Sequence, residues 1–333
     1  MQTEQVVFNC PDNVLNPPGR TLKMCAKRYW RAATSEDDSG LTLLFVHGIG
    51  ANKEQWEPTI DGVLCRLPCP VREAWAVEWQ TCGDSAVLNR EVLSASPGRA
   101  YLSVSAFEWS EAIAEFIQSP YLQGRRIVLV GHSAGAVAAV LTLKHLTPSS
   151  VAALIQIETT ATFREDYYRK IEDRLPGLEA VVKATRNRRE TWSSRDEALE
   201  WMKARIPWKL WDPRVLRGLV DHALESIPGA GPGVRLKNDR KLEAITFPHV
   251  EPPFAAAEEL QRISTFVPVH FIWASGATLV PDFMRESFES RKIAASVRML
   301  EGGHMIVQEK PDAVAEAICA ILNTSIHVFH SRL

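Results

Sequence analysis

Short, nearly continuous apolar runs recur along the chain, separated by longer segments that mix apolar and polar positions. The clearest runs are Leu41–Val46, Arg126–Val130, Val151–Ile157 and Val267–Ala274. A run of this kind is typical of a strand buried on both faces of a sheet, whereas the amphipathic segment Ser105–Gln118 predicts a helix. Strands and helices alternating at this spacing predict the α/β fold class, with a doubly wound, mostly parallel sheet.

The same pattern completes the expected order of elements. Further strands are predicted at Gln5–Asn9, Leu22–Ala33, Val71–Glu78 and Ser296–Leu300, a loop at residues 80–100, and helices at Trp56–Leu67, Ala136–Leu141, Pro281–Ser290 and Pro311–Leu322. The alternation stops from Phe163 to about Leu260, where the sequence is helical and charged. We therefore expect a core made of residues 1–160 and 261–333, with a flexible tail at 324–333, and a helical cap at 161–260. Such a cap would lie over the carboxyl ends of the strands, where open α/β sheets bind ligands.

Composition is that of an ordinary globular protein. The chain has 333 residues, of which 46% are hydrophobic and 23% charged, and its formal net charge is −2. This charge gives no reason to expect nucleic acid or an anionic membrane as a partner, and no apolar run reaches the ~18 residues of a membrane-spanning helix. The first residues, Met1–Gln5, lack the features of a signal peptide, so we expect a soluble, unsecreted protein. The six cysteines are scattered and are expected to be free thiols, with no metal or cofactor bound.

One predicted strand ends in a G-x-S-x-G pentapeptide, Gly131-His132-Ser133-Ala134-Gly135, which is followed by the small and aliphatic residues of Ala136–Leu141. A strand, a sharp turn at serine and a helix form the context in which this pentapeptide is a nucleophile elbow. Gly131 and Gly135 lack the bulk that would collide at such a strained turn. The five residues also fit an ordinary glycine-bounded turn, but the flanking segments favour a nucleophilic Ser133.

Two further motifs accompany the pentapeptide, the H-G-x-G loop His47–Gly50 and the segment Gly302–Met305 before the last helix. In this order the set resembles an α/β-hydrolase with an inserted cap, over nearly all of the chain from Leu41 to Leu322. The resemblance implies that His304, chosen from nine histidines by its place after the last strand, takes the proton of Ser133. It also implies an oxyanion hole built from the backbone N–H groups of Ile49 and Ala134.

The third member of a catalytic triad is less obvious. Most of the family carry an aspartate after the next-to-last strand, where this chain has Ala277, and alanine cannot orient an imidazole. Glu158 stands at the end of an earlier strand, the position from which haloalkane dehalogenases take their acid. The hypothesis is therefore a triad of Ser133, Glu158 and His304. The first alternative is that Asp282 is the acid. The second is that the site has no acid.

A serine at the elbow predicts acyl-enzyme chemistry on an ester, thioester or amide. The chain ends Ser331-Arg332-Leu333, which differs from the peroxisomal address Ser-Lys-Leu by one basic residue and predicts binding to the peroxisomal import receptor. In combining a serine elbow with this C-terminal tripeptide, the chain resembles fungal peroxisomal hydrolases of secondary-metabolite and toxin biosynthesis, such as mycophenolyl-CoA hydrolase. The resemblance implies a small-molecule acyl-CoA substrate. The alternatives are a carboxylesterase or lipase acting on oxygen esters, and a non-hydrolytic binding protein or cyclase.

Two groups of residues in the expected cap allow two interpretations each. The basic cluster could hold coenzyme A phosphates or form a solvated helix face; it comprises Lys183, Arg186, Arg188 and Arg189. The tryptophans could line an acyl pocket or pack the interior of the cap; they are Trp201, Trp208 and Trp211.

Overall fold

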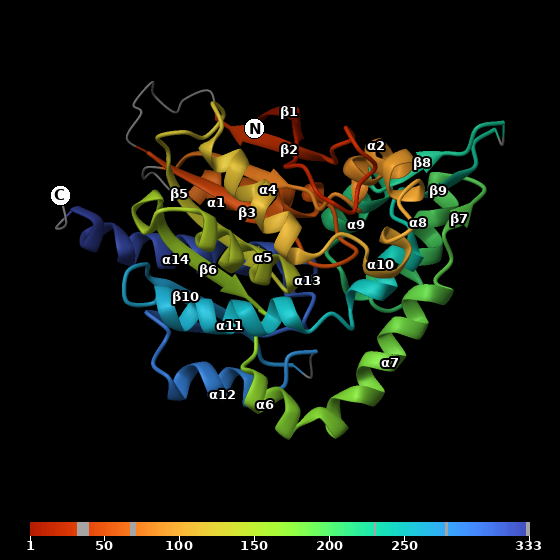
Figure 1. The fold of residues 1–333 in the computed structure, drawn as a ribbon. Coiled ribbons are helices and arrows are strands. Elements are labelled where there is room, and N and C mark those ends of the chain that lie inside the picture. Colours follow the sequence, from red (N-terminus) through yellow and green to blue (C-terminus); the bar gives the residue numbers. More distant parts are fainter. Residues whose placement is uncertain (32–39, 67–70, 230, 277–278, 331–333) are drawn as a thin grey trace.

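The computed structural model of the chain describes residues 1–31, 40–66, 71–229, 231–276 and 279–330 (Figure 1). In these residues one sheet has eight strands in the order β1-β2-β4-β3-β5-β6-β10-β11. Their bounds are β1 Gln2–Asn9, β2 Lys23–Trp30, β3 Leu41–Val46, β4 Val71–Val77, β5 Arg126–His132, β6 Val151–Ile157, β10 Val269–Ala274 and β11 Ser296–Leu300. The pairs β1–β2 and β2–β4 are antiparallel, and all other neighbours are parallel. The predicted fold class is therefore confirmed.

Helices cover both faces of the sheet. One face packs against α4, α5, α11 and α12, and the other against α1, α13 and α14. Figure 1 shows α4, α5 and α11 in front of the sheet and α14 behind it. The helices outside the cap are α1 Glu57–Arg66, α2 Gly83–Ser94, α3 Arg99–Leu102, α4 Ala106–Gln118, α5 Ala134–Thr142, α11 Glu251–Ile263, α12 Asp282–Ser290, α13 Ile306–Glu309 and α14 Pro311–His330, with short 3₁₀ turns η1 Lys53–Trp56, η2 Leu143–His145 and η3 Pro148–Ser150.

The unbroken apolar runs of the central strands follow from these two helical layers. In β3, Leu44 packs into the core on the α4 and α5 side, whereas Leu43 and Phe45 pack into the core on the α1 and α14 side. Successive strand side chains point to opposite faces, so a strand covered on both sides needs apolar residues at every position. No helix in the described ranges is both long and apolar enough to cross a bilayer.

A cap lies between β6 and α11. It contains α6 Arg164–Arg169, α7 Ile171–Asn187, α8 Arg195–Lys203, η4 Trp208–Leu210, α9 Pro213–His222 and α10 Arg240–Thr246, together with a small sheet of β7 Thr191–Trp192, β8 Leu224–Ser226 and β9 Val234–Leu236. The segment expected as a helical cap at 161–260 therefore also contains three short strands beside its helices. At its end, α11 packs on α5 and contributes Ala257 and Leu260 to the main core, so this helix belongs with the core.

Two other expectations differ from the structure. Residues 80–100, expected as a loop, contain α2 and the start of α3. The buried face of α2 is largely small or polar, with Gly83, Ser85 and Asn89, so it leaves little apolar periodicity to detect. The last helix, expected to end at Leu322 before a flexible tail at 324–333, continues to His330. The expected import signal at 331–333 lies outside the described residues.

Candidate active site

The G-x-S-x-G pentapeptide joins the end of β5 to the start of α5. Ser133 has φ 55° and ψ −124°, a strained combination for a residue with a side chain, and the serine lines a cavity. A Cβ at Gly131 would lie 2.4 Å from the Cα of Ala136, and one at Gly135 would lie 2.2 Å from the carbonyl oxygen of His47. Both glycines are therefore required by close backbone approach, which is the role that the sequence predicts for them.

The structure brings Ser133, His304 and Glu158 together in one chain of hydrogen bonds. The Nε2 atom of His304 lies 2.9 Å from the hydroxyl oxygen of Ser133, and its Nδ1 atom lies 3.1 Å from Oε2 of Glu158. A carboxylate can only accept, so Nδ1 carries the proton and Nε2 is free to accept the serine hydroxyl. Glu158 is fully buried, whereas Ser133 and His304 are 9% and 8% exposed and line the cavity.

Glu158 follows β6 directly and is held in a fixed orientation. Its backbone N–H donates to the Ile272 carbonyl, and its other carboxylate oxygen, Oε1, accepts the N–H of Ala274 at 2.7 Å. Its φ of 46° is unusual for a residue other than glycine and turns the side chain toward His304. The alternative acid, Asp282, begins α12 with its side chain 75% exposed and pairs with Arg285. Ala277 lies outside the described residues.

Two buried histidines support the loops on either side of Ser133. His132 donates from Nε2 to the carbonyl of His304 at 2.8 Å, and His47 donates from Nδ1 to the carbonyl of Gly48 while its Nε2 accepts the N–H of Trp79. Burial lowers the pKa of His132 to about 3 and that of His47 to about 4. Both rings therefore stay neutral at physiological pH and act as fixed hydrogen-bonding groups.

The two backbone amides expected to form an oxyanion hole border the same cavity. Ala134 is the first residue of α5, where an amide has no carbonyl partner within its helix, and Ile49 lies in the loop after β3. Both residues line the cavity beside Ser133. Preorganised amides in this position can stabilise negative charge on a substrate oxygen.

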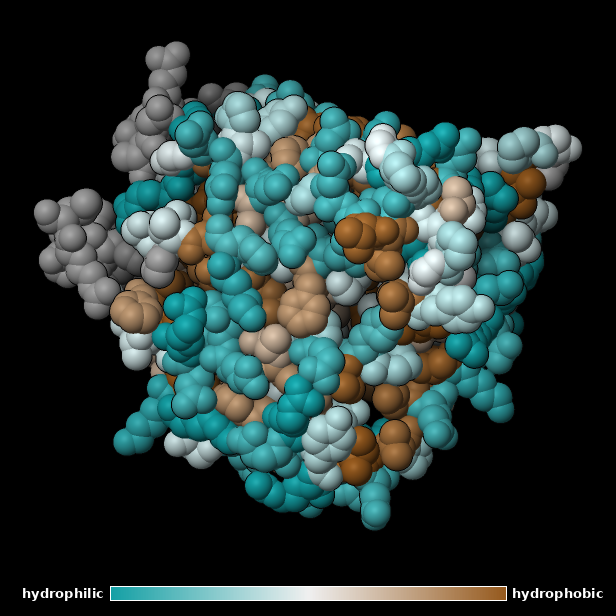
Figure 2. All heavy atoms as spheres, viewed as in Figure 1, coloured by the Kyte–Doolittle hydropathy of each residue, from teal (hydrophilic) through white to brown (hydrophobic). Residues whose placement is uncertain are grey.

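The cavity that Ser133 opens into has a volume of about 1130 Å³. It lies between the carboxyl ends of the strands and the cap, and α7, η4 and α10 contribute to its wall. Figure 2 shows a mainly hydrophilic outer face on which apolar side chains gather at the lower right, over α7 and its surroundings in Figure 1. A space of this size holds a ligand larger than a simple short-chain ester.

The tryptophans and the basic cluster of the cap differ in their relation to the cavity. The three tryptophans line the cavity and also pack in the cap's apolar cluster around Trp192, so both interpretations hold for them. In the basic cluster, Arg188 makes two hydrogen bonds to Glu243, and Arg189 bonds to Glu197. Lys183 and Arg186 are exposed and do not line the cavity. This cluster is thus engaged with carboxylates or faces solvent, which disfavours it as a phosphate grip.

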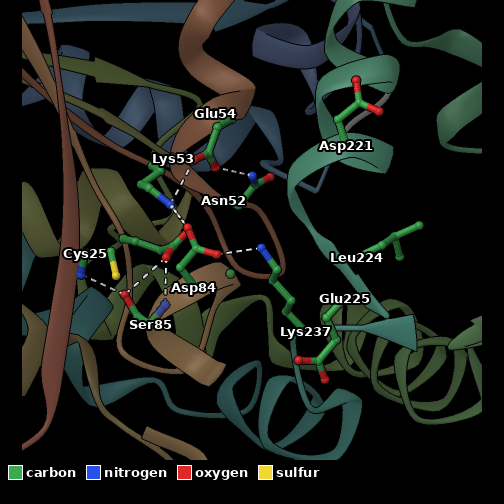
Figure 3. Close-up of polar contacts among 12 residues, drawn as sticks. Cys25, Asn52, Lys53, Glu54, Asp84, Ser85, Asp221, Leu224, Glu225 and Lys237 are labelled. Carbon is green, nitrogen blue, oxygen red and sulfur yellow. Dashed lines mark hydrogen bonds and ion pairs between the residues drawn. The ribbon is translucent and has the colours of Figure 1, made fainter. Parts of the chain in front are cut away.

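A buried charge network lies next to the H-G-x-G loop, and sequence reasoning missed it. The Lys53 ammonium is fully buried and lies 2.9 Å from Glu54, 2.8 Å from Asp84 and 3.3 Å from Glu78. Figure 3 shows Lys237 of the cap reaching the same Asp84 carboxylate. Asn238, next in sequence, accepts the N–H of Gly83 and donates to the carbonyl of Gly50 at 3.4 Å. The network therefore joins the cap to the loop that carries Ile49.

Charge balance explains how this network tolerates burial. Burial by itself would lower the pKa of Lys53, but the three carboxylates outweigh it and raise that pKa. Burial raises the pKa of Glu78, while Lys53 and Lys237 hold the pKa of Asp84 well below its usual range against the effect of burial. Two signals in the sequence could have revealed the contact between Lys53 and Glu78. Lys53 follows the buried strand β3 by a few residues, and Glu78 follows β4 directly.

Comparisons with known proteins were informative for the fold. A family model described as the alpha/beta hydrolase family matches residues 43–317, and a search among curated proteins finds no match. Among solved structures, the chain is similar to the peroxisomal alpha-beta-hydrolase Lpx1 from Saccharomyces cerevisiae, at 18% identity and a TM-score of 0.76, covering 98% of this chain and 90% of that one.

Two further solved structures are similar to this chain over nearly its whole length. The thioesterase domain from the curacin biosynthetic pathway gives 17% identity and a TM-score of 0.66, covering 96% of this chain and 99% of that one. The esterase Rv0045c of M. tuberculosis gives 20% identity and a TM-score of 0.63, covering 97% of this chain and 92% of that one. At such identities the likeness shows the fold alone.

Proposed function

The chain belongs to the alpha/beta hydrolase family, and on that premise we propose that it is a serine hydrolase that cleaves an ester or thioester through an acyl-enzyme intermediate. The observation that carries the proposal is the unbroken hydrogen-bond chain from the Ser133 hydroxyl through His304 to the buried Glu158. Ser133 and His304 line a cavity that is large enough for an acyl substrate.

In the proposed acylation step the Ser133 oxygen attacks the substrate carbonyl carbon while Nε2 of His304 takes its proton. Glu158 accepts a hydrogen bond from Nδ1 throughout and stabilises the imidazolium that forms. The amides of Ile49 and Ala134 bind the oxygen of the tetrahedral intermediate. His304 then gives its proton to the leaving alcohol or thiol, and water attacks the acyl-serine by the same route in reverse.

For the substrate we propose an acyl-CoA thioester with a bulky acyl chain, acted on in the peroxisome. The support is the Ser331-Arg332-Leu333 ending, the roomy and largely apolar cavity, and the similarity in fold to a hydrolase described as peroxisomal and to a thioesterase domain. An oxygen ester is the alternative, since the triad alone does not identify the leaving group.

Labelling with a fluorophosphonate probe tests the mechanism. The wild-type protein should be labelled and the Ser133→Ala variant should not, while Ser110→Ala, which removes a hydroxyl on α4 outside the cavity, should label normally. Steady-state rates on octanoyl-CoA and p-nitrophenyl octanoate then separate thioesterase from esterase. A folded wild-type protein that neither reacts with the probe nor turns over either substrate would overturn the proposal in favour of a non-hydrolytic binding protein.

The compartment is tested separately. A fluorescent reporter fused ahead of residues 323–333 should become punctate with a peroxisomal marker, and deletion of the last three residues should return it to the cytosol. A diffuse signal from the intact fusion would refute peroxisomal import through this ending.

A further inference from the structure

Helix α7 forms one wall of the cavity and presents a distinct stripe to it. Among the residues of α7 that line the space, Arg174, Leu178, Val181 and Thr185 recur at helical spacing along one side, with Asp173, Gly177 and Ala184 beside them. Positions separated by three or four residues lie on the same face of a helix, so this stripe is continuous. It is apolar in its middle and carries a positive charge near the N-terminal end of the helix.

Arg174 sits where α6, α7 and α12 meet. Its guanidinium donates to the sulfur of Met284 at 2.9 Å and lies over the rings of Tyr167 and Phe283, 5.2 and 6.0 Å from their centres. A thioether and two rings are uncharged, and among the described residues no carboxylate forms an ion pair with this guanidinium. The adjacent Asp173 also lines the cavity, but its carboxylate is mostly exposed to water and lies 4.0 Å from Lys170.

The other arginines around the cavity are placed differently. Arg188 and Arg189 are engaged with Glu243 and Glu197, and Arg205 is exposed and donates to the carbonyl of Trp201. Burial lowers the pKa of Arg174, because no neighbouring carboxylate offsets the loss of water. A guanidinium has five donors, of which Met284 accepts one, so an anion entering the cavity would find most of them available.

We propose that Arg174 binds an anionic group of the substrate, a carboxylate or a phosphate remote from the scissile bond. The inference rests on the proposed function and narrows it to esters or thioesters that carry such a group. The apolar stripe from Leu178 to Thr185 would pack along the intervening chain, and the planar guanidinium would make paired hydrogen bonds to the anion. A neutral substrate of the same length would leave the guanidinium unpaired.

Two matched substrate pairs test this inference and distinguish the two anions. The first pair is the p-nitrophenyl monoester of octanedioic acid against p-nitrophenyl octanoate, and the second is octanoyl-CoA against octanoyl-N-acetylcysteamine, which lacks phosphate. Wild-type protein should prefer the charged member of at least one pair. Arg174→Gln should lower kcat/KM for that member about 10- to 100-fold, and change the neutral member less than about 2-fold, as expected for loss of a charge-assisted hydrogen bond.

Arg186→Gln is the matched control, since it makes the same change on the exposed side of α7. It should leave all four rates unchanged, and Arg174→Lys should restore part of the preference. An equal loss on both members of a pair would overturn the proposal by showing a structural role, as would a wild-type protein with no preference in either pair. Fluorophosphonate labelling keeps these outcomes distinct from failure of the proposed function, because Arg174→Gln should still be labelled at Ser133.

Discussion

Replacing Glu158 by glutamine should remove catalysis by reversing one hydrogen bond. The Ala274 N–H donates to Oε1 of Glu158 at 2.7 Å, so in the variant this position must be taken by the amide oxygen. The amide nitrogen is then forced to face Nδ1 of His304, where a donor meets a donor. The imidazole escapes this conflict by carrying its proton on Nε2, which points it at Ser133 and leaves no lone pair to accept the serine proton.

The expected size of the effect follows from the loss of the productive tautomer. An acid-to-amide change at the same position of a serine triad lowers kcat by about 10⁴-fold, or about 5.5 kcal/mol of barrier. KM should change little, because Glu158 is fully buried and does not line the cavity. The free energy of unfolding should also change little, since the amide has the shape of the carboxylate.

Initial rates on a p-nitrophenyl ester and the rate of fluorophosphonate labelling measure this loss, and urea unfolding checks the fold. Asp282→Asn is the control, because that carboxylate is 75% exposed and should leave kcat near wild type. The reasoning would be refuted if Glu158→Gln retained more than a tenth of the wild-type kcat, or if Asp282→Asn lost activity to a comparable extent.

Three further predictions concern the surroundings of the triad. Lys53→Met should lower the free energy of unfolding by about 3–5 kcal/mol, because it leaves buried carboxylates without their cation, and adding Glu78→Gln should recover part of it in urea titrations. Gly50→Ala should lower both stability and kcat, since the φ of Gly50 is +74° and the new Cβ would lie 2.6 Å from Oε1 of Glu243. Gly19→Ala is the control, because Gly19 has a φ of +72° but no atom within 4 Å of the new Cβ, so this variant should lose only the backbone strain of about 1–2 kcal/mol. The buried neutral side chains of His47 and His132 should make the protein acid-labile, because folding lowers the pKa of each ring. Their contribution to the free energy of unfolding is complete above about pH 6.5 and is lost as the pH falls toward about 4 for His47 and about 3 for His132, by up to about 1.4 kcal/mol per pH unit for each. A free energy of unfolding that stays constant between pH 7 and 5 would contradict this prediction.

The central layers of this fold could be read from the sequence because their signals are local. Strands buried on both sides must be apolar at every position, which makes Leu41–Val46 and Val151–Ile157 visible without any tertiary knowledge. The turn at Ser133 is visible for a similar reason, since the glycines that flank it are demanded by backbone contacts within a few ångström. Glu158 could be proposed as an acid because it ends a recognisable strand.

Other features depend on contacts between distant segments, and the sequence carries little sign of them. Helix α2 buries Ser85 and Asn89, which bond to backbone groups of β2 and of Gln80 in the loop before α2, so the polarity of this helix is typical of a loop. The short strands of the cap have two or three residues each, below the length at which alternation is detectable. Which cations of the cap are neutralised also depends on partners such as Glu243, which lies far from Arg188 in sequence.

The distribution of buried charge indicates where the cap can move at least cost. Opening the side that carries Lys237 and Asn238 would break contacts with Asp84, Gly83 and Gly50, and would separate charges that are mostly hidden from water. Helix α7 buries only Thr185 among its described residues and carries Pro176 in its interior, so its displacement exposes little apolar area. Substrate entry past the N-terminal part of α7, which would keep the buried Arg188–Glu243 pair at the other end of the helix closed, would also leave the loop bearing Ile49 in place, so that the oxyanion amides stay preorganised while the cavity opens.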